Sequence, residues 1–277
     1  MKQVDLHCHS TVSDGSLTPS ELVRRAAGRG VDLLALTDHD QLAGLAEAEQ
    51  LAHELGLDFV HGVEVSVTWR GSTVHVVGLA IDPDDASLAA GLAQVRSGRT
   101  RRAEAMARSL DAVGIGGSFE GALRHAANPA MIGRAHFARH LASIGVVGSA
   151  AEAFRRYLVP GKPGYVPHAW AALRDAVGWI RGAGGHAVLA HPGRYRLSAG
   201  ALHALLDEFR AAGGSALEVV TSSHTPDQFR LFTALGQRFG LCASRGSDFH
   251  APGEGAEFGA LPAFALSIAP IWDAWRS

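Results

Sequence analysis

The stretch Val4-Asp5-Leu6-His7-Cys8-His9, close to the start of the chain, decides how the rest of the sequence is interpreted. A β-strand alternates its side chains between two faces, so we expect His7 and His9 to point one way and Cys8 the other. Imidazole and carboxylate groups are common metal ligands. Two imidazoles on one strand face, followed by the loop carboxylate of Asp14, therefore make half of a metal site.

Further metal-type residues recur where apolar runs end. In parallel β/α architectures, functional residues gather at the carboxyl ends of strands. A single His or Asp there is commonly a turn or cap residue, but that explanation would have to hold separately for every cluster. We therefore expect all of them to converge on one site. The clusters are Thr37-Asp38-His39-Asp40, Gly62-Val63-Glu64, Val74-His75-Val76, Ala190-His191-Pro192 and Ser247-Asp248-Phe249-His250.

The order of apolar runs and helical patterns predicts the fold class. Residues 65–69 and 73–79 flank Arg70-Gly71-Ser72 and predict a β-hairpin, and Glu64 would end the strand before it. Repeated β/α units predict an α/β protein with a mostly parallel sheet or barrel. Other strands are expected at 4–6, 31–36, 57–63, 187–190, 216–220 and 241–244, and helices at 19–30 and 41–55.

Residues 97–167 break this alternation. They have a helical pattern and end in the turn-rich segment 160–167. We interpret them as a helical insertion that covers the active site, carried by a barrel made of residues 1–96 and 168–277. The basic run Arg99-Thr100-Arg101-Arg102 lies at a helix start, where such runs are usually solvated.

Composition narrows the possible partners. The 277-residue chain has a formal charge of -2, so no global basic field would recruit duplex nucleic acid. Its two cysteines, Cys8 and Cys242, form no CxxC unit and suit a reducing cytoplasm rather than a disulfide framework. No apolar run approaches the roughly 20 residues needed to span a bilayer, and no apolar signal segment is visible. We expect a cytoplasmic protein with no membrane partner.

The number of candidate ligands exceeds what one ion can bind. The nine candidates are His7, His9, Asp14, His39, Glu64, His75, His191, Asp248 and His250. Imidazole and carboxylate without thiolate suit Mn, Fe(II), Zn or Mg. Two or three divalent ions sharing a bridging carboxylate would use all nine, and such a centre can activate water and clamp both oxygens of an in-line displacement. Phosphate esters are the natural substrates of this chemistry.

At this point the motifs resemble those of the polymerase and histidinol phosphatase (PHP) superfamily, over the whole chain outside the insertion. The resemblance implies a distorted seven-stranded β/α barrel with a three-metal site, with Mn as the expected ion. It further implies that Asp38 and Asp40 orient His39 by hydrogen bonds. The implied ligands are His7, His9, Glu64 and Asp248 for the first ion, Glu64, His75 and His191 for the second, and Asp14, His39 and His250 for the third.

Within the superfamily, the chain is similar to the group of nucleotide 3',5'-bisphosphate phosphatases and 5'-to-3' oligoribonucleases. The compact His-Cys-His-Ser opening, the helical insertion and Gly133-Arg134-Ala135-His136 carry this similarity. It implies that a metal-bound hydroxide removes the 3'-phosphate of nucleoside 3',5'-bisphosphates and attacks short 5'-phosphorylated oligonucleotides. Glu64, His191 and Asp248 would be the catalytic residues. The partner would be a small nucleotide or short single-stranded RNA, with no obligate protein partner.

A bisphosphate also needs cations and donors besides the metals. Arginine suits bidentate phosphate contacts, and other candidates lie on the insertion, in its exit loop or after later strands. The predicted substrate-binding residues are Arg134, His136, Lys162, Arg194, Ser222 and His224.

Two alternatives remain open from the sequence. One is a histidinol-phosphate phosphatase, whose pocket needs an acid for the substrate amine, whereas a nucleoside needs stacking or apolar walls. The other is a non-catalytic PHP module that binds a polymerase or another partner. The complete set of nine ligands disfavours this second alternative.

Overall fold

The computed structural model describes residues 2–263 and 267–275. Seven strands lie in the order β1-β2-β3-β4-β6-β7-β8, and a short β5 pairs with β3 beside this path. The strands are β1 (Val4–Asp5), β2 (Leu33–Leu36), β3 (Asp58–Trp69), β4 (Ser72–Leu79), β5 (Ala171–Ala172), β6 (His186–Leu189), β7 (Ala216–Thr221) and β8 (Cys242–Gly246).

The sheet closes between its first and last strands. Leu6 donates its backbone N–H to Arg245 at 3.0 Å, and Asp248 donates to His7 at 2.8 Å. Strand β4 is antiparallel to both β3 and β6, whereas the other neighbours along the path are parallel. The predicted distorted seven-stranded β/α barrel is confirmed.

The predicted break at Glu64 is wrong. Strand β3 runs without interruption for 12 residues, so Glu64 lies in its middle rather than at its end. Pairing with β4 continues from Gly62 to Trp69 and explains the extension, because each residue of this outer half finds a partner in the hairpin. The predicted hairpin is correct, but its turn is one residue shorter than predicted, because Ser72 already pairs with Trp69. Arg70 and Gly71 have φ values of 47° and 79°, as a two-residue type I′ turn requires.

Alternate residues of β3 share one face, and that face makes three different connections. Glu64 enters the cluster of histidines. Ser66 donates its hydroxyl hydrogen to Asp40 at 2.9 Å and accepts a hydrogen bond at 3.3 Å from Arg99, at the start of the insertion. Thr68 accepts the backbone N–H of Trp170 at 2.8 Å, just after the insertion ends. One strand therefore contacts the candidate site and both ends of the insertion.

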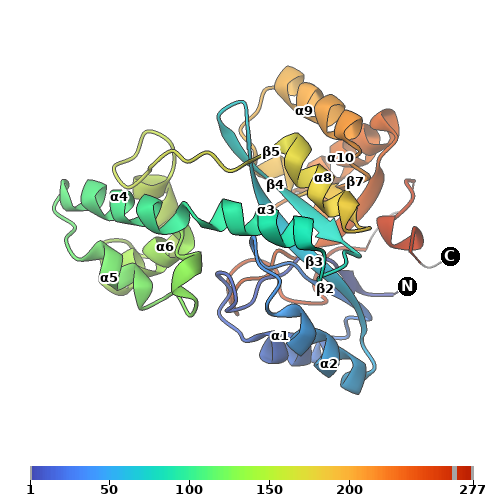
Figure 1. Ribbon diagram of the computed structural model, residues 1–277, viewed down its shortest axis with the longest axis horizontal. Coiled ribbons are helices and arrows are strands. Elements are labelled where there is room, and N and C mark those ends of the chain that lie inside the picture. The colour runs from blue at the N-terminus through green and yellow to red at the C-terminus, as the bar shows by residue number, and fades with distance from the viewer. Residues whose placement is uncertain (1, 264–266, 276–277) are drawn as a thin grey trace.

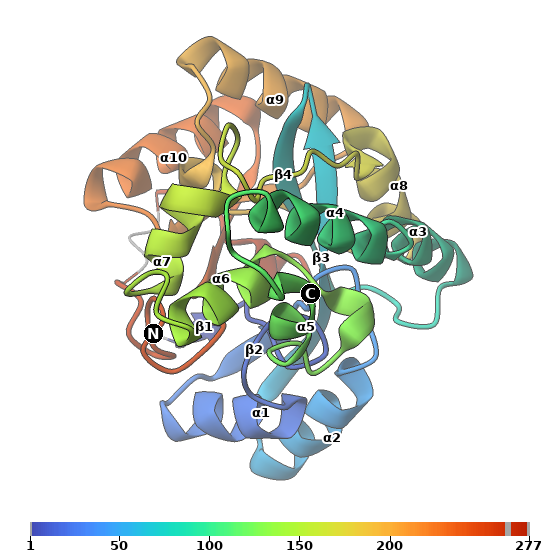
Figure 2. The same ribbon diagram turned by 90° about the vertical axis from the view of Figure 1, so that its left-hand side faces the viewer.

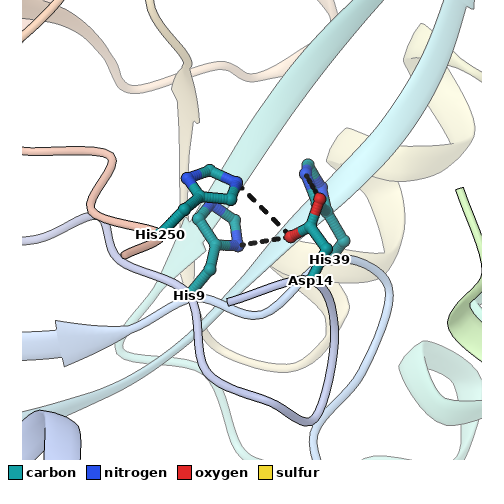
Figure 3. Close-up of side chains that lie close together, drawn as sticks. All are labelled: His9, Asp14, His39 and His250. Carbon is teal, nitrogen blue, oxygen red and sulfur yellow. Dashed lines mark ion pairs between the residues drawn. The ribbon is translucent and has the colours of Figure 1, made fainter. Parts of the chain in front are cut away.

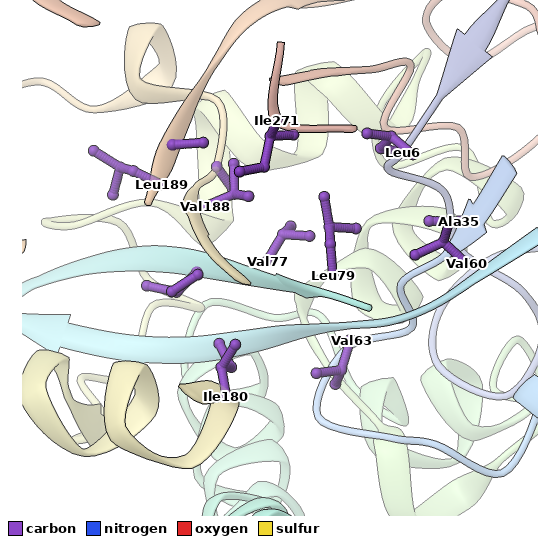
Figure 4. Close-up of a cluster of buried hydrophobic side chains, with 14 of the residues drawn as sticks. Leu6, Ala35, Val60, Val63, Val77, Leu79, Ile180, Val188, Leu189 and Ile271 are labelled. Carbon is purple, nitrogen blue, oxygen red and sulfur yellow. The ribbon is translucent and has the colours of Figure 1, made fainter. Parts of the chain in front are cut away.

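Apolar side chains of the strands fill the barrel and pack against the surrounding helices. Figure 4 shows Val77 and Leu79 of β4 beside Val188 of β6, while Ile180 of α8 lies on the other side of the same strands. The barrel helices are α1 (Pro19–Gly28), α2 (Leu45–Leu55), α3 (Ala86–Arg96), α8 (Leu173–Gly182), α9 (Ala199–Ala212) and α10 (Pro226–Phe239).

Sequence signals at the helix ends explain several of these bounds. Thr18 caps α1 in a reciprocal capping box with Glu21, and Pro19 takes the first helical position. Gly56 ends α2 in the left-handed conformation, with φ of 69°. Helix α2 begins at Leu45 rather than at the predicted residue 41.

Residues 97–167 form a separate helical lobe beside the barrel (Figure 1). Turned by 90°, the lobe lies in front of the barrel strands (Figure 2). It has an apolar cluster of its own that includes Met106, Leu110, Phe137 and Leu141. Its helices are α4 (Arg99–Asp111), α5 (Ser118–Leu123), α6 (Arg134–Ser143) and α7 (Ala150–Ala153), with short η1 (Pro129–Met131) and the π-helical η2 (Phe154–Leu158). In the barrel, η3 (Pro192–Arg194) and η4 (Ile271–Asp273) are short turns of 3₁₀ helix.

Among the described helices, none combines the length and the apolar character needed to cross a membrane.

Candidate active site

Nine side chains from distant parts of the chain form one cluster, which we call the donor cluster. Ligand-type atoms within it lie within 4.8 Å of one another in four overlapping groups. His7 and His9 face each other with their Nε2 atoms 3.1 Å apart, while the buried Cys8 thiol points away and donates to Ala35. The members are His7, His9, Asp14, His39, Glu64, His75, His191, Asp248 and His250.

Glu64 lies at the centre of the donor cluster and is 1% exposed. Its Oε1 atom is 3.0 Å from Nδ1 of His75 and 3.0 Å from Nε2 of His191. Its Oε2 atom faces the other side, 3.4 Å from His7, 3.3 Å from His9 and 2.9 Å from His39. Two oxygens that face different sets of imidazoles are the arrangement that a bridging carboxylate requires.

Asp14 lies close to three histidines of the donor cluster, as Figure 3 shows. Its carboxylate lies 3.3 Å from His250, 3.9 Å from His39 and 4.0 Å from His9. The sequence resemblance grouped Asp14, His39 and His250, and the structure brings His9 to the same point.

Buried polar atoms without partners indicate what the donor cluster lacks. Nδ1 of His9, His39 and His75 and Oδ1 of Asp14 are buried and make no hydrogen bond, although Nδ1 of His39 and of His75 lies within 3.0 Å of Glu64. Such atoms are costly unless a ligand satisfies them. Imidazole nitrogens and carboxylate oxygens at these separations fit divalent metal ions.

The charges of the donor cluster are strongly coupled. Burial lowers the pKa of His9 to about 3 and that of His75 to about 4. Burial also opposes the charged form of His250, but the carboxylates of Asp14 and Asp248 outweigh it and raise the pKa to about 9. The pKa of Glu64 is held well below its usual value, because the surrounding imidazoles outweigh the effect of burial.

Backbone strain concentrates around the donor cluster. Asp40, His191 and Asp248 adopt positive φ values of 50°, 25° and 54°. Non-glycine residues pay for such conformations, and they persist where the surrounding structure holds them. Gly246 lets His7 approach, because a Cβ atom there would lie 2.3 Å from the Cβ of His7.

Asp38 and Asp40 do not bind His39, so that prediction is wrong. Asp38 instead accepts hydrogen bonds from the hydroxyls of Ser10 and Ser13, at 2.6 and 2.5 Å. It thereby shapes the loop that carries Asp14. Asp40 turns toward the insertion, where it accepts from Ser66 and pairs with Arg99.

A cavity of about 340 Å³ opens over the donor cluster, between the barrel and the insertion. This is within the range of small-molecule sites. The barrel contributes His39, Glu64, His75 and other cluster residues. The insertion contributes Met131, Arg134, Ala150 and Phe154 among others, and Trp170 follows directly after it.

Arginines dominate the side of the cavity that the insertion forms, and two of them were missed. Arg99 and Arg102 were expected to be solvated, but they are only 8% and 9% exposed. Both guanidinium groups lie against the ring of Trp170, at 4.8 and 5.2 Å from its centre. The signal lay in their spacing of three residues, which places both on the buried face of α4.

The structure divides the predicted substrate-binding residues into two sets. Arg134, Arg194 and Ser222 line the cavity, and Arg194 pairs with Asp248 of the donor cluster. Lys162 is exposed in the exit loop and is not among the residues that line the cavity. His136 is buried at the start of α6, where its Nδ1 atom accepts the backbone N–H of Gly133 at 3.0 Å.

His224 is occupied within the protein, which contradicts its predicted phosphate contact. Its Nδ1 atom donates to the carbonyl of Val219 at 2.9 Å. Its Nε2 atom accepts the backbone N–H of Gly193 at 3.0 Å. The ring therefore links strand β7 to the loop after His191, and the residue supports the site without facing the substrate.

Glu218 of β7 is a further residue of the site that the sequence analysis missed. It is 1% exposed and contacts both the ring of His7 and the backbone of His191. The sequence did contain an indication of this role, because Glu218 is the one acid within the apolar run 216–220 and buried acids are rare unless they are paired.

Comparison with known proteins agrees with this geometry. The PHP domain family matches residues 5–113. A 3',5'-nucleoside bisphosphate phosphatase of Chromobacterium violaceum is 54% identical over 98% of this chain and 96% of its own length. A 5'-3' exoribonuclease of Haemophilus influenzae is 40% identical over 98% of both chains. A solved structure from Bifidobacterium adolescentis, described as a metal-dependent phosphoesterase, has a TM-score of 0.81 and 27% identity, covering 99% of this chain and 94% of its own.

Proposed function

This chain belongs to the PHP domain family, and from that premise we propose that it is a metal-dependent phosphoesterase acting on nucleoside 3',5'-bisphosphates and short 5'-phosphorylated RNA. It removes the 3'-phosphate from the bisphosphate and releases 5'-mononucleotides from RNA. One observation carries the proposal: a single cavity has the donor cluster on one side and arginines on the other.

A bisphosphate needs two places for negative charge, and the cavity offers two. The donor cluster is the place for the reacting phosphate. Arg102 and Arg134 offer the other, because each uses one nitrogen on a backbone carbonyl, of Val166 and Leu158 respectively. Within the described chain neither has a carboxylate partner at ion-pair distance, so both can bind an anion.

The nine residues of the donor cluster would hold two or three divalent ions, with Glu64 as the bridge. Mn is our expected ion, with Fe, Zn or Mg as alternatives for the same nitrogen and oxygen donors. Bound ions would supply an activated water and neutralise the phosphate oxygens. Glu64, His191 and Asp248 are the catalytic residues in this assignment, because they would hold the ions that supply this chemistry.

The chain's own residues position the substrate around this centre. Arg194 and Ser222 line the cavity next to the donor cluster, where they would contact the reacting phosphate. Phe154 and Trp170 offer ring surfaces, and Met131 an apolar one, for the sugar and base. These residues lie on or beside the insertion, which supports its assignment as the cover of the active site.

The reaction uses water directly rather than a covalent intermediate. Cys8 is fully buried and points away from the cluster, and Ser13 and Ser66 commit their hydroxyl hydrogens to Asp38 and Asp40. Burial raises the pKa of the Cys8 thiol well above its usual value, so the thiolate that an attacking cysteine needs is disfavoured.

Histidinol phosphate fits this cavity less well. Its amine would need a free carboxylate, but Asp14, Glu64 and Asp248 belong to the donor cluster and Glu254 pairs with Arg139. The cationic residues opposite the donor cluster favour a second anion instead.

We place the enzyme in the cytoplasm. Cys8 and Cys242 are both free, and a reducing compartment keeps such thiols unpaired.

A panel of substrates tests the proposal with Mn(II) present. Phosphate release would be compared for adenosine 3',5'-bisphosphate, 3'-AMP, 5'-AMP, histidinol phosphate and short RNA with or without a 5'-phosphate. We expect the bisphosphate and the 5'-phosphorylated RNA to be the best substrates. Activity confined to histidinol phosphate would overturn the substrate assignment, and inactivity on every ester with full metal occupancy would overturn the enzyme itself.

A further inference from the structure

A buried acid that the reaction does not use contacts two members of the donor cluster from behind. Glu218 lies in β7 opposite Ser244 of β8, next to an irregularity in the pairing of these two strands. Its Oε1 atom is 2.7 Å from Nδ1 of His7, and its Oε2 atom accepts the backbone N–H of His191 at 2.6 Å. An ionised carboxylate is retained in such a buried position only when both oxygens are well satisfied.

The contacts indicate where the hydrogens lie. The backbone nitrogen of His191 can only donate, so Oε2 of Glu218 accepts from it. A neutral imidazole that binds a metal ion through Nε2 carries its hydrogen on Nδ1, and Nδ1 of His7 lies 2.7 Å from Oε1 of Glu218. We therefore assign a hydrogen to Nδ1 of His7. Its Nε2 atom then presents a lone pair to the donor cluster, 3.4 Å from Glu64 and 3.5 Å from Asp248.

The second contact holds a strained segment. His191 has φ of 25° and ψ of 57°, outside the relaxed regions for a residue with a side chain. The bond from its N–H to Glu218 resists relaxation of this backbone. It thereby keeps the His191 ring beside Glu64, at 3.0 Å.

We propose that Glu218 is a positioning residue that selects the metal-binding tautomer of His7 and fixes the backbone of His191. A carboxylate is required because both contacts need an acceptor. Glutamine has the same shape but only one acceptor oxygen. The backbone N–H of His191 would bond to that oxygen, so the amide group would face His7. In Glu218→Gln the amide would donate to Nδ1 of His7, which moves the ring hydrogen to Nε2 and removes the lone pair from the cluster.

The test combines metal affinity with a spectroscopic measurement of the tautomer, so it does not depend on any substrate. Zinc affinity would be measured by competition with a chromogenic chelator, and His7 would be observed by ¹⁵N NMR in the zinc-loaded, diamagnetic protein. For Glu218→Gln we expect about 10- to 100-fold weaker zinc binding at one site. We also expect the Nδ1 hydrogen signal of His7 to be lost. The matched control is Glu208→Gln, an acid of α9 that bonds to Trp69 and Arg70 away from the cavity.

Unchanged zinc affinity together with an unchanged His7 spectrum in Glu218→Gln would overturn the proposal. If that variant does not fold, the ¹⁵N NMR spectrum of the zinc-loaded natural protein is sufficient. A hydrogen on Nε2 rather than Nδ1 of His7 in that spectrum would contradict the assignment. A failed substrate panel would leave both measurements intact, so this inference and the proposed function can fail separately.

Discussion

Replacing Arg102 by alanine is the sharpest test of how the cavity recognises its substrate. The guanidinium group is buried, faces the cavity and bonds through Nε to the carbonyl of Val166 at 3.0 Å. Among the residues that the structure describes, it has no carboxylate partner whose charge would be left buried and unpaired by the substitution, so the loss should report substrate binding. Burial and the neighbouring Arg134 lower the pKa of Arg102 to about 10, which still leaves it charged at neutral pH.

The expected magnitude comes from a single charge-assisted contact. Such a contact contributes about 1.5–3 kcal/mol, and about 1.4 kcal/mol corresponds to a tenfold change. We therefore expect kcat/KM for a nucleoside 3',5'-bisphosphate to fall by about 10- to 160-fold in Arg102→Ala. The loss should appear mainly in KM, because Arg102 would bind a phosphate that does not react.

The assay compares adenosine 3',5'-bisphosphate with p-nitrophenyl phosphate, which has no second phosphate. Arg101→Ala is the matched control, since Arg101 is the adjacent residue of the same helix but is exposed. Arg102→Ala should reduce activity on the bisphosphate alone. An equal loss on both substrates would refute the reasoning and indicate damage to the donor cluster or to packing against Trp170.

Further tests address the donor cluster and the reaction. Purified protein should contain more than one transition ion per chain, and Glu64→Ala should reduce both the metal content and, by several orders of magnitude, kcat; full activity with one ion would exclude the bridge. Chelation should lower the melting temperature, because ions at 100 times their dissociation constant stabilise the fold by about 2.7 kcal/mol. Zinc addition at pH 7 should release protons in calorimetry across several buffers, since His250, with a pKa of about 9 without metal, must lose its proton to bind. Hydrolysis in ¹⁸O-water should place one label in the released phosphate with inversion at phosphorus, whereas retention would indicate a phosphoenzyme.

The parts of the fold that short-range patterns determine could be predicted from the sequence. Alternation of side chains placed His7 and His9 together, although β1 ends at Asp5 and the two histidines lie in the extended segment after it. The turn residues Arg70-Gly71-Ser72 predicted the hairpin correctly. The continuation of β3 through Glu64 could not be predicted, because it depends on pairing with β4 over the whole outer half of the strand.

The convergence of the donor cluster was predictable because seven separate segments carried the same chemistry at comparable positions. The cationic side of the cavity could not be predicted from the sequence. Whether Arg99 and Arg102 are solvated depends on how α4 packs against Trp170. His224 shows the opposite error. A residue after a strand end looked accessible, but both its nitrogens are used by neighbouring backbone groups.

The shared face of β3 has a consequence for how this chain can change in length. Glu64, Ser66 and Thr68 alternate along one strand, so inserting or deleting a single residue before them would turn all three to the opposite face. Such an indel would remove the donor cluster's central acid and the contacts that this strand makes with both ends of the helical lobe. The tip at Arg70 and Gly71 lies beyond these residues, so extra residues there leave the register intact. Across related chains, we expect gaps to be frequent at the tip and rare between residues 62 and 69.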